Sequence, residues 1–485
     1  MDMKLKNISR MSLLIMTLLF FSCGNLIDTQ PTYQLSDNVA FQSLSDVEQF
    51  LNGSYSSLRS GSYYGGTYGV LADMAGEDLF ETGESLGNFR NVVDWLYATN
   101  DGIVSAAWIT PYNLINNLNL VLVNVEKFQE DVPGRKNRII GQVLALRALA
   151  HFDLLRYFGQ SYDRNSTALG VPIKVKSEIT KPTRNTVKEV YDQIYADLSQ
   201  ARTLLGTVDR DINTAASRKY VDQIVVNAIQ ARVALYAKDY PTAISSATSV
   251  ISSLSLASGA AFRSIWSQDA VANEVIWSIA YIPGEGQPYG NVFFAVNNRL
   301  SFNVAPELVA LYDQANDIRY SSYFSTTLSL PTGPVRSGTI VPIKALGRNG
   351  ATDANVDFKA FRVGEMRLIR AEARAISGLD GGDVASMEDI NALRTARITG
   401  YVNQNLSGAT LKSAIAIERR KELFSEGHRW FDIRRAGLGI TRGANCGAPA
   451  TRCSLDAANF RFVWPIPLDE IIANPNMASQ QNPGY

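Results

Sequence analysis

Histidine and cysteine are both scarce in this chain of 485 residues. It has two histidines, His151 and His428, and three cysteines. Zinc sites are built mainly from these two residue types, so no metal site is expected. Each histidine falls inside a segment with a helical pattern, which favours a structural role over a catalytic one. No Ser-His-Asp grouping stands out, and the glycines of residues 61–69 lack a phosphate-loop lysine. The sequence therefore predicts no cofactor and no enzyme activity.

The chain also lacks a net charge and a long hydrophobic run. It has 46 basic and 46 acidic residues, and 43 basic and 45 acidic residues remain once residues 1–22 are removed. Nucleic-acid binding requires a basic face, so a nucleic-acid partner is not expected. No segment after the N-terminus is apolar enough to cross a bilayer, which takes about 20 apolar residues.

The N-terminus carries the pattern of an export signal. Three basic residues precede the short apolar run Met11–Phe21, and Ser22 and Cys23 follow it directly. A basic start, a short apolar stretch and a small residue are typical of a signal peptide. The order of residues up to Cys23 is similar to the lipobox of bacterial lipoproteins, with Phe20 where leucine is usual.

This pattern divides the start of the chain into two parts. Residues 1–22 are interpreted as a signal peptide, and residues 23–38 as a polar tether that begins at a lipidated, palmitate-bearing Cys23. Lipid chains added to that cysteine would anchor the protein to a membrane surface, since each buried methylene contributes about 0.8 kcal/mol. The alternative is an ordinary secretory signal with an incidental cysteine.

The other two cysteines lie close together near the C-terminus. Cys446 and Cys453 belong to a loop rich in glycine, alanine and proline, Gly443–Ser454. Export places a protein in an oxidising environment, where a local disulfide can form. A disulfide between them is favoured, and two free thiols are the alternative.

Apolar residues recur at helical spacing through the first half of the chain. Thr186 and Glu189 match a capping box, as do Ser45 and Glu48. The predicted helices include one that begins at Ser45 and the segments Trp108–Val125, Arg135–Phe158, Tyr220–Ala237 and Pro241–Leu254. Arg135–Phe158 is apolar on several sides, which predicts a helix packed between neighbours. Helix pairs of this kind suggest tetratricopeptide-like stacking and a mostly α fold, although no strict 34-residue period is present.

The second half of the chain has a different sequence pattern. It predicts a strand at Glu274–Tyr281, mostly loop over residues 283–360, and four further helical segments: Glu365–Ser377, Ser386–Arg397, Leu411–Ala436 and Leu468–Ile472. An N-terminal helical part, residues 39–260, and a loop-rich C-terminal part, residues 261–485, are expected to pack as one structural unit, because stacked repeats extend without dividing into domains.

Several segments resemble the SusD/RagB family of outer-membrane nutrient-binding lipoproteins of Bacteroidetes. Ala145–Gly159 is similar to the central helix of the family, and Glu418–Arg435 is the most specific match. The ending also matches, through Phe462–Pro467, Asn474–Asn476 and Gln481–Tyr485. These segments follow the order that the family shows, and together the resemblance covers nearly the whole mature chain.

The resemblance implies a fold, a location and a partner. The fold is mostly helical with four tetratricopeptide-like pairs and a loop-rich, SusD-like C-terminal part. The location is the outer membrane, with the lipid-anchored protein facing the exterior. The partner is a SusC-like TonB-dependent transporter, over which the lipoprotein sits as a lid. Family members bind oligosaccharides or polysaccharides, and some bind peptides, without transforming them.

Two groups of acidic residues resemble known catalytic or metal-binding patterns. Glu418, Glu422 and Glu426 recur at the spacing of helical neighbours, a separation of about 5–6 Å that resembles the carboxylate pair of a retaining glycosidase. Basic residues alternate with them, so an ion-paired helix that supports the fold is favoured. Residues 353–357 imitate the start of an EF-hand loop, but Phe358 stands where glycine is required. A structural role is therefore favoured over calcium binding.

A flat aromatic ring can cover the apolar face of a sugar while polar side chains bind its hydroxyls. The segment Asn88–Asn100 carries residues of both kinds, where family members often have binding residues. The candidate ligand-binding residues are Asp73, Arg90, Trp95, Tyr97, Asn100 and Tyr289. The alternative for Trp95 and Tyr97 is a place in the core.

The sequence is compatible with four functions. Binding of oligosaccharide for uptake is favoured, and peptide capture by the same architecture, as in RagB-like proteins, is the alternative. A surface glycoside hydrolase is less favoured, because the sequence offers no convincing carboxylate pair in a cleft. A structural lid without affinity for a ligand is the fourth possibility.

Overall fold

The computed structural model of the chain describes most of the residues after the tether. These are residues 40–66, 68–207, 212–281, 289–295, 299–328, 338–443, 446 and 452–485. The expected signal peptide, Cys23 and the tether lie outside them. Among the described residues, no helix combines the length and the apolar character that crossing a membrane requires.

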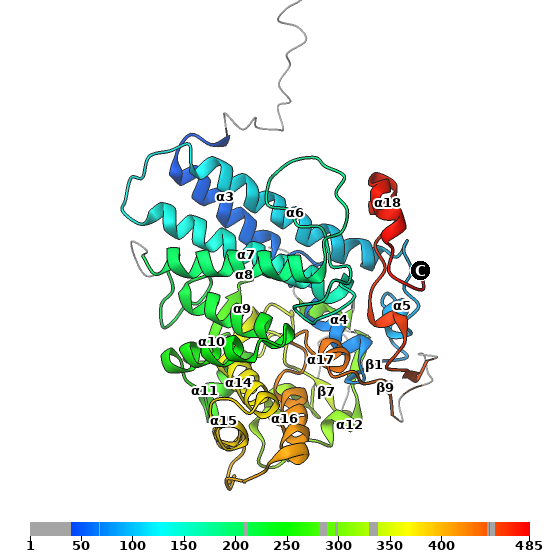
Figure 1. The fold of residues 1–485 in the computed structure, drawn as a ribbon. Helices are drawn as coiled ribbons and strands as arrows, with labels where there is room; N and C mark the ends of the chain where they lie inside the picture. Colours follow the sequence, from blue (N-terminus) through cyan, green and yellow to red (C-terminus); the bar gives the residue numbers. More distant parts are fainter. Residues whose placement is uncertain are drawn as a thin grey trace, which may run out of the picture.

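Six long helices form the N-terminal part, and sequence neighbours pack against one another (Figure 1). They are α3 (Leu44–Ser57), α6 (Gly102–Val125), α7 (Arg135–Phe158), α8 (Val187–Leu205), α9 (Gln223–Tyr236) and α10 (Tyr240–Ser253). Helix α6 packs on α3 and α7, α7 on α8, and α9 on α10. The mostly α fold predicted from the sequence is confirmed, and this order of packing is consistent with tetratricopeptide-like pairs.

Helix α7 lies at the centre of this array. Its bounds are those predicted from the sequence, and it is buried without interruption from Gly141 to Phe158. Gly141 allows α8 to approach, since a Cβ atom there would lie 2.6 Å from the Cγ atom of Leu205. Asp153, in the middle of α7, accepts hydrogen bonds of 2.6 Å from the hydroxyls of Tyr63 and Tyr64. These tyrosines come from residues 61–69, which were expected to form only a loop.

Of the two predicted capping boxes, the one at α8 is confirmed and the one at α3 is not. At α8, Glu189 N donates to Thr186 Oγ1 over 3.2 Å and Thr186 N donates to the Glu189 carboxylate over 2.7 Å, which confirms the box. At α3 the prediction is wrong by two residues. The N-cap is Ser43, whose Oγ accepts from Asp46 N. Serine is a good N-cap at either position, so the sequence alone did not distinguish them.

The helices of the second half pack onto the first. They are α11 (Gly259–Ser267), α12 (Pro306–Val309), α13 (Ile318–Tyr323), α14 (Val363–Ser377), α15 (Gly382–Arg397), α16 (Gly408–Glu422), α17 (Arg429–Arg435) and α18 (Leu468–Ala473). Helix α14 packs against α15 and α16 and also against α9 and α10, so it joins the two parts of the chain (Figure 1). Two short helices from the first part, α4 (Tyr68–Ala75) and α5 (Arg90–Val93), lie near the C-terminal elements.

In the part of the chain that the structure describes, short antiparallel strands occur as five separate pairs. The pairs are β1 (Leu79–Glu81) with β5 (Phe302–Val304), β2 (Val275–Ile279) with β8 (Phe358–Arg362), β3 (Phe294–Ala295) with β4 (Arg299–Leu300), β6 (Phe324–Ser325) with β7 (Val341–Pro342), and β9 (Ile440–Thr441) with β10 (Ser454–Leu455). The predicted strand at Glu274–Tyr281 is confirmed as β2. Its partner β8 lies at the end of a stretch that was expected to be mostly loop.

The single helix predicted over Leu411–Ala436 is wrong, because the structure has two helices there. Helix α16 ends at Glu422 and α17 begins at Arg429. Between them Ser425 and Gly427 adopt positive φ angles of 62° and 80°, a conformation incompatible with a continuing α-helix. Glu426 therefore lies in the turn rather than on the helix that carries Glu418 and Glu422.

The three glutamates are buried and ion-paired, as the favoured interpretation predicts. Glu422 lies 2.8 Å from Arg362, 2.9 Å from Arg397 and 3.1 Å from Arg319. Glu418 pairs with Arg319 and Arg394, and Glu426 pairs with Arg362 and Lys344. Each carboxylate is thus held by cations from other elements, which is a structural arrangement and not a pair of carboxylates facing an open cleft.

Candidate functional site

The predicted site residues do not form an exposed aromatic platform. Trp95, Tyr97 and Tyr289 are each 0–1% exposed. Trp95 Nε1 donates to the carbonyl oxygen of Ala75 over 2.8 Å, and the guanidinium of Arg442 covers the ring at 4.2 Å from its centroid. The expectation that these rings stack on a sugar is contradicted, because both faces of Trp95 are enclosed by protein.

Tyr97 and Tyr289 are both core residues that pack against other aromatic rings. The Tyr97 hydroxyl donates to the carbonyl oxygen of Arg461, and its ring centroid lies 5.1 Å from that of Trp464. Tyr289 packs edge-on against Phe358, with the ring centroids 5.2 Å apart. The sequence could not separate the two roles, since a tyrosine suits a buried position with one hydrogen bond as well as a ligand surface.

Asp73 is also a buried residue. Its Oδ1 accepts from the backbone N–H of Ser425 over 3.0 Å, so it ties α4 to the turn between α16 and α17. Burial raises the pKa of Asp73 well above its ordinary value. A carboxyl group in this position supports the turn and is not available to a ligand.

Arg90 and Asn100 are the two candidates that reach the surface. The side chain of Arg90 is 33% exposed and pairs with the buried carboxylate of Glu81 on β1. Asn100 is exposed and directly precedes Asp101, which caps α6 through a 2.8 Å hydrogen bond from Ile103 N. We call the exposed surface of residues 77–101 the loop surface. Strand β1, helix α5 and the start of α6 position its polar side chains.

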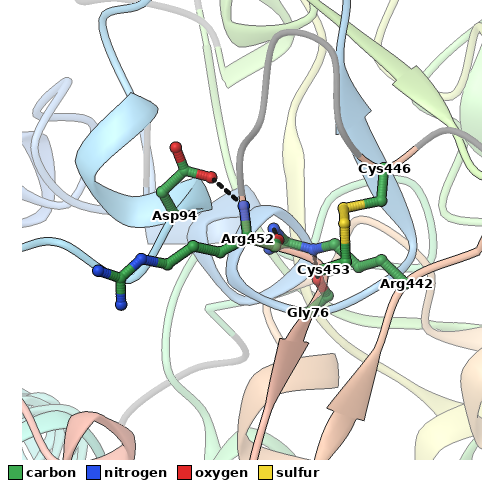
Figure 2. Close-up of a disulfide and its surroundings, with 6 residues drawn as sticks. All are labelled: Gly76, Asp94, Arg442, Cys446, Arg452 and Cys453. Atoms are coloured by element: carbon green, nitrogen blue, oxygen red, sulfur yellow. Dashed lines mark hydrogen bonds between the residues drawn. A yellow bond between two sulfur atoms is a disulfide. The ribbon is translucent and has the colours of Figure 1, made fainter.

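A disulfide supports the loop surface from the side. The structure pairs Cys446 with Cys453, with Cα atoms 5.5 Å apart (Figure 2). The adjoining Arg452 donates its backbone N–H to Asp94 over 3.3 Å, as Figure 2 shows. Arg442 reaches the carbonyl oxygens of Gly76 and Met74 over 3.0 and 3.1 Å. The disulfide-linked hairpin β9–β10 is thereby fastened to the base of the loop surface.

A small cavity lies beside the loop surface. It has a volume of about 20 Å³ and is lined by residues that include Glu77, Phe80, Glu307 and Arg442. Such a volume holds about one water molecule.

The residues considered for calcium binding have protein partners. Asp357 accepts from the backbone N–H of Tyr281 over 2.8 Å and pairs with Arg348 over 2.6 Å. Asp353 accepts from Asn355 N within its own turn. Across the described parts of the chain, no three acidic, histidine or cysteine side chains converge as metal ligands do.

A larger cavity lies on another part of the molecule and was not predicted from the sequence. It has a volume of about 440 Å³, and residues from Gln160 to Leu438 line it. These residues come from helices α9, α14, α16 and α17, from the start of α10 and from the loops that follow α7, α9 and α17. No local motif could reveal it, because segments far apart in the chain build it together.

Comparisons with known proteins agree with this fold. A family model described as "Starch-binding associating with outer membrane" matches residues 27–221, and the SusD family model matches residues 336–485. A SusD superfamily structure from Bacteroides thetaiotaomicron is 26% identical, with a TM-score of 0.80 over 91% of this chain and 100% of that one.

Two further relatives extend the likeness. A putative sugar binding protein from Bacteroides vulgatus is 27% identical, with a TM-score of 0.76 over 92% of this chain and 99% of that one. SusD-like protein P2 of Formosa agariphila is 24% identical and aligns with 98% of this chain and 99% of its own. With the fold, the order of the matched segments and the two family models in agreement, the chain belongs to the SusD/RagB family.

Proposed function

We propose that this protein is a cell-surface lipoprotein that binds an oligosaccharide and passes it to a SusC-like TonB-dependent transporter, without transforming it. The observation that carries the proposal is membership of the SusD/RagB family, together with the likeness to the sugar binding protein of Bacteroides vulgatus. The family model for the N-terminal part is described by starch binding at the outer membrane, which supports both the ligand class and the location.

The loop surface is the proposed place of binding. Arg90 and Asn100 provide donors and acceptors that can bind sugar hydroxyls, and loops positioned by a rigid scaffold often carry binding residues. The scaffold here is the buried set of Trp95, Tyr97 and the hairpin that the disulfide closes. In this arrangement the aromatic residues hold the surface in shape, and the polar residues contact the ligand.

The anchor of the proposed lipoprotein is Cys23. Loss of its thiol by Cys23→Ser is expected to abolish incorporation of labelled palmitate and to release the protein from the membrane fraction. The control is Cys446→Ser, which removes a cysteine that the structure places in a disulfide and not at the proposed lipid site. Membrane retention of the Cys23→Ser variant would contradict the anchor.

Calorimetry tests ligand binding. We expect the purified protein to bind one member of a panel of oligosaccharides and polysaccharides and to bind none of a matched panel of peptides. Asn100→Ala is expected to weaken that binding about tenfold, because a hydrogen bond to a sugar hydroxyl is lost. Asn403→Ala is the matched control, since Asn403 is an exposed asparagine between α15 and α16.

The outcomes separate the candidate functions. Binding of peptides but not of glycans would replace the proposed ligand class with the peptide alternative. Binding of a glycan with equal affinity by both asparagine variants would retain the ligand class but reject the loop surface. Shortening of the bound glycan during the measurement would overturn the proposal that the protein does not transform its ligand.

A further inference from the structure

The 440 Å³ cavity lies where the two parts of the chain meet, between the turn after α9 and helices α14, α16 and α17. Its size falls within the range of small-molecule sites, about 300–1,000 Å³. Six basic residues and three acidic residues line it. The lining therefore carries more positive than negative charge, although the chain as a whole has no net charge.

The acidic residues of the lining already have partners. Asp432 accepts from Arg419 and Arg435, each over 3.0 Å. Glu372 accepts from Arg435 over 2.9 Å and lies 3.5 Å from Arg419. Asp163 lies 3.6 Å from Lys238. Each of the three carboxylates is thus engaged by a cation of the same lining.

Two cations of the lining, Arg434 and Lys412, have no carboxylate partner among the described residues. Arg434 donates to the carbonyl oxygen of Arg156 over 2.9 Å and to that of Gly159 over 2.6 Å, and its guanidinium lies 4.2 Å from the ring centroid of Tyr162. Within the described residues, no carboxylate pairs with Arg434 or with the exposed Lys412. Two positive charges beside the cavity therefore remain without an anion.

Two buried donors of the lining are also unpaired. Arg419 is 3% exposed and Tyr236 is 1% exposed. Arg419 Nη1 and the Tyr236 hydroxyl have no hydrogen-bond partner among the described residues. Roughly 90% or more of buried polar groups in native structures have a partner, so these two donors on residues of one lining can each donate to a further hydrogen-bond acceptor.

We propose that this cavity binds a small ligand through a carboxylate or sulfate group. The anion would accept from Arg419 Nη1 and the Tyr236 hydroxyl and would balance the charges of Arg434 and Lys412. Guanidinium groups suit the planar oxygens of carboxylates and the oxygens of sulfate, and a charged acceptor makes such hydrogen bonds stronger than neutral ones. The cavity is separate from the loop surface, so this proposal stands or falls independently of glycan capture there.

Titration calorimetry at constant ionic strength tests the ligand class. The probes are sodium sulfate, sodium acetate, sodium glucuronate and neutral glucose, added to the full-length protein with chloride as the balancing anion. We expect saturable binding of sulfate or of a carboxylate, and no binding of glucose. Tighter binding of glucuronate than of acetate would identify an acidic sugar as the ligand, whereas sulfate alone would identify a sulfate group. Failure of all three anions to bind would overturn the proposal.

Two variants locate the binding within the cavity. Tyr236→Phe removes a hydroxyl that makes no hydrogen bond to any residue the structure describes, so the fold should persist while anion affinity falls about tenfold. Lys412→Gln should lower affinity severalfold and flatten the dependence on salt, since an exposed charge is screened by ions.

Matched controls complete the test. Tyr191→Phe removes another buried hydroxyl without a described partner, but Tyr191 does not line the cavity. Lys188→Gln removes a surface lysine that pairs with Asp192 on α8. Both controls should bind the anion as the unaltered protein does. Unchanged affinity in Tyr236→Phe and Lys412→Gln, or an equal loss in the controls, would show an adventitious ion only and overturn the proposal.

Discussion

At the scale of single residues, the buried charges of the C-terminal part have the clearest physical role. Burial alone would raise the pKa of Glu422, but Arg397, Arg362 and Arg319 outweigh it and hold the pKa well below the ordinary value of 4.5. Glu422 therefore stabilises the fold at any pH above that ordinary value. The contribution is lost as the pH falls below 4.5 towards the lowered pKa of the folded state.

Glu422→Gln is expected to destabilise the fold strongly. Removal of one member of a buried ion cluster leaves uncompensated charge, which typically costs about 3–5 kcal/mol. Urea unfolding at pH 7 measures the change, and Glu388→Gln, at an exposed glutamate of α15, is the control with an expected effect of about 0.5 kcal/mol or less. The variant should also lose less stability on acidification, because glutamine does not titrate. Similar unfolding midpoints for the two variants would argue against the network.

His151 is expected to remain neutral in the folded protein at pH 5.5. Burial lowers its pKa to about 4. Its Nδ1 lies 3.0 Å from the carbonyl oxygen of Arg147, and its Nε2 accepts from Lys174 N over 3.2 Å, so a second ring proton would oppose that N–H. Between pH 6.5 and 4 the unfolded chain binds a proton that the folded chain does not, and stability falls as the pH falls through this window.

A titration followed by nuclear magnetic resonance measures the His151 pKa directly. The imidazole signals should show no protonation until the pH is well below 6. His151→Gln, in which the side-chain oxygen can still accept from Lys174 N, should reduce the loss of stability between pH 6.5 and 4.5. A midpoint close to 6.5 would mean that the ring is accessible to water.

At the scale of elements, helices with a strong apolar period were predictable and the loops between them were not. Arg135–Phe158 was predicted with the bounds that the structure shows, because the row of apolar residues and the preceding Pro133-Gly134 both mark it. The break between α16 and α17 was missed, because Ser425 carries no sequence signal for its positive φ angle. Strand β2 was predicted, but its partner β8 and β1 with β5 were missed, because these pairings join segments far apart in the sequence.

Thr186→Ala is expected to lower stability by about 1 kcal/mol. The substitution removes the acceptor for Glu189 N and leaves one of the first N–H groups of α8 without its partner. The free energy of unfolding by urea measures the loss. Thr203→Ala, near the other end of α8, is the control, since the Thr203 hydroxyl only donates to the carbonyl oxygen of Ser199 within the helix. Equal effects of the two substitutions would argue against a capping role.

At the scale of the whole molecule, the C-terminal tail connects the end of the chain to its first half. Asn482 Nδ2 donates to the carbonyl oxygens of Phe158 and Trp464 over 2.9 and 2.7 Å, and its Oδ1 accepts from Arg184 over 2.9 Å. Trp464 N in turn donates to the carbonyl oxygen of Tyr157 over 2.9 Å. The ending that carried part of the family resemblance thus has a structural role, because it closes the end of α7.

Asn482→Ala is expected to cost about 1–3 kcal/mol, because the carbonyl oxygen of Trp464 loses its Asn482 donor and the carbonyl oxygen of Phe158 and Arg184 Nη1 each lose one of their two hydrogen bonds. Thermal unfolding should show a clear decrease in Tm. Asn476→Ala is the control, since the exposed Asn476 donates only to the carbonyl oxygen of Lys181. A decrease as small as that of the control would show that the tail is not required to hold the two parts together.

The sequence by itself determined the family, the helical fold and the structural role of the charged segment Glu418–Arg435, because these depend on periodicity, on caps and on motifs that are local in the chain. It also predicted the Cys446–Cys453 disulfide, which depends on two neighbouring cysteines. Only the tertiary structure decided which aromatic residues are exposed. Trp95 and Tyr289 are core residues because segments distant in sequence cover them, and the 440 Å³ cavity exists because helices of both parts meet around it. Burial and cavities are properties of packing between distant segments, and no local pattern encodes them.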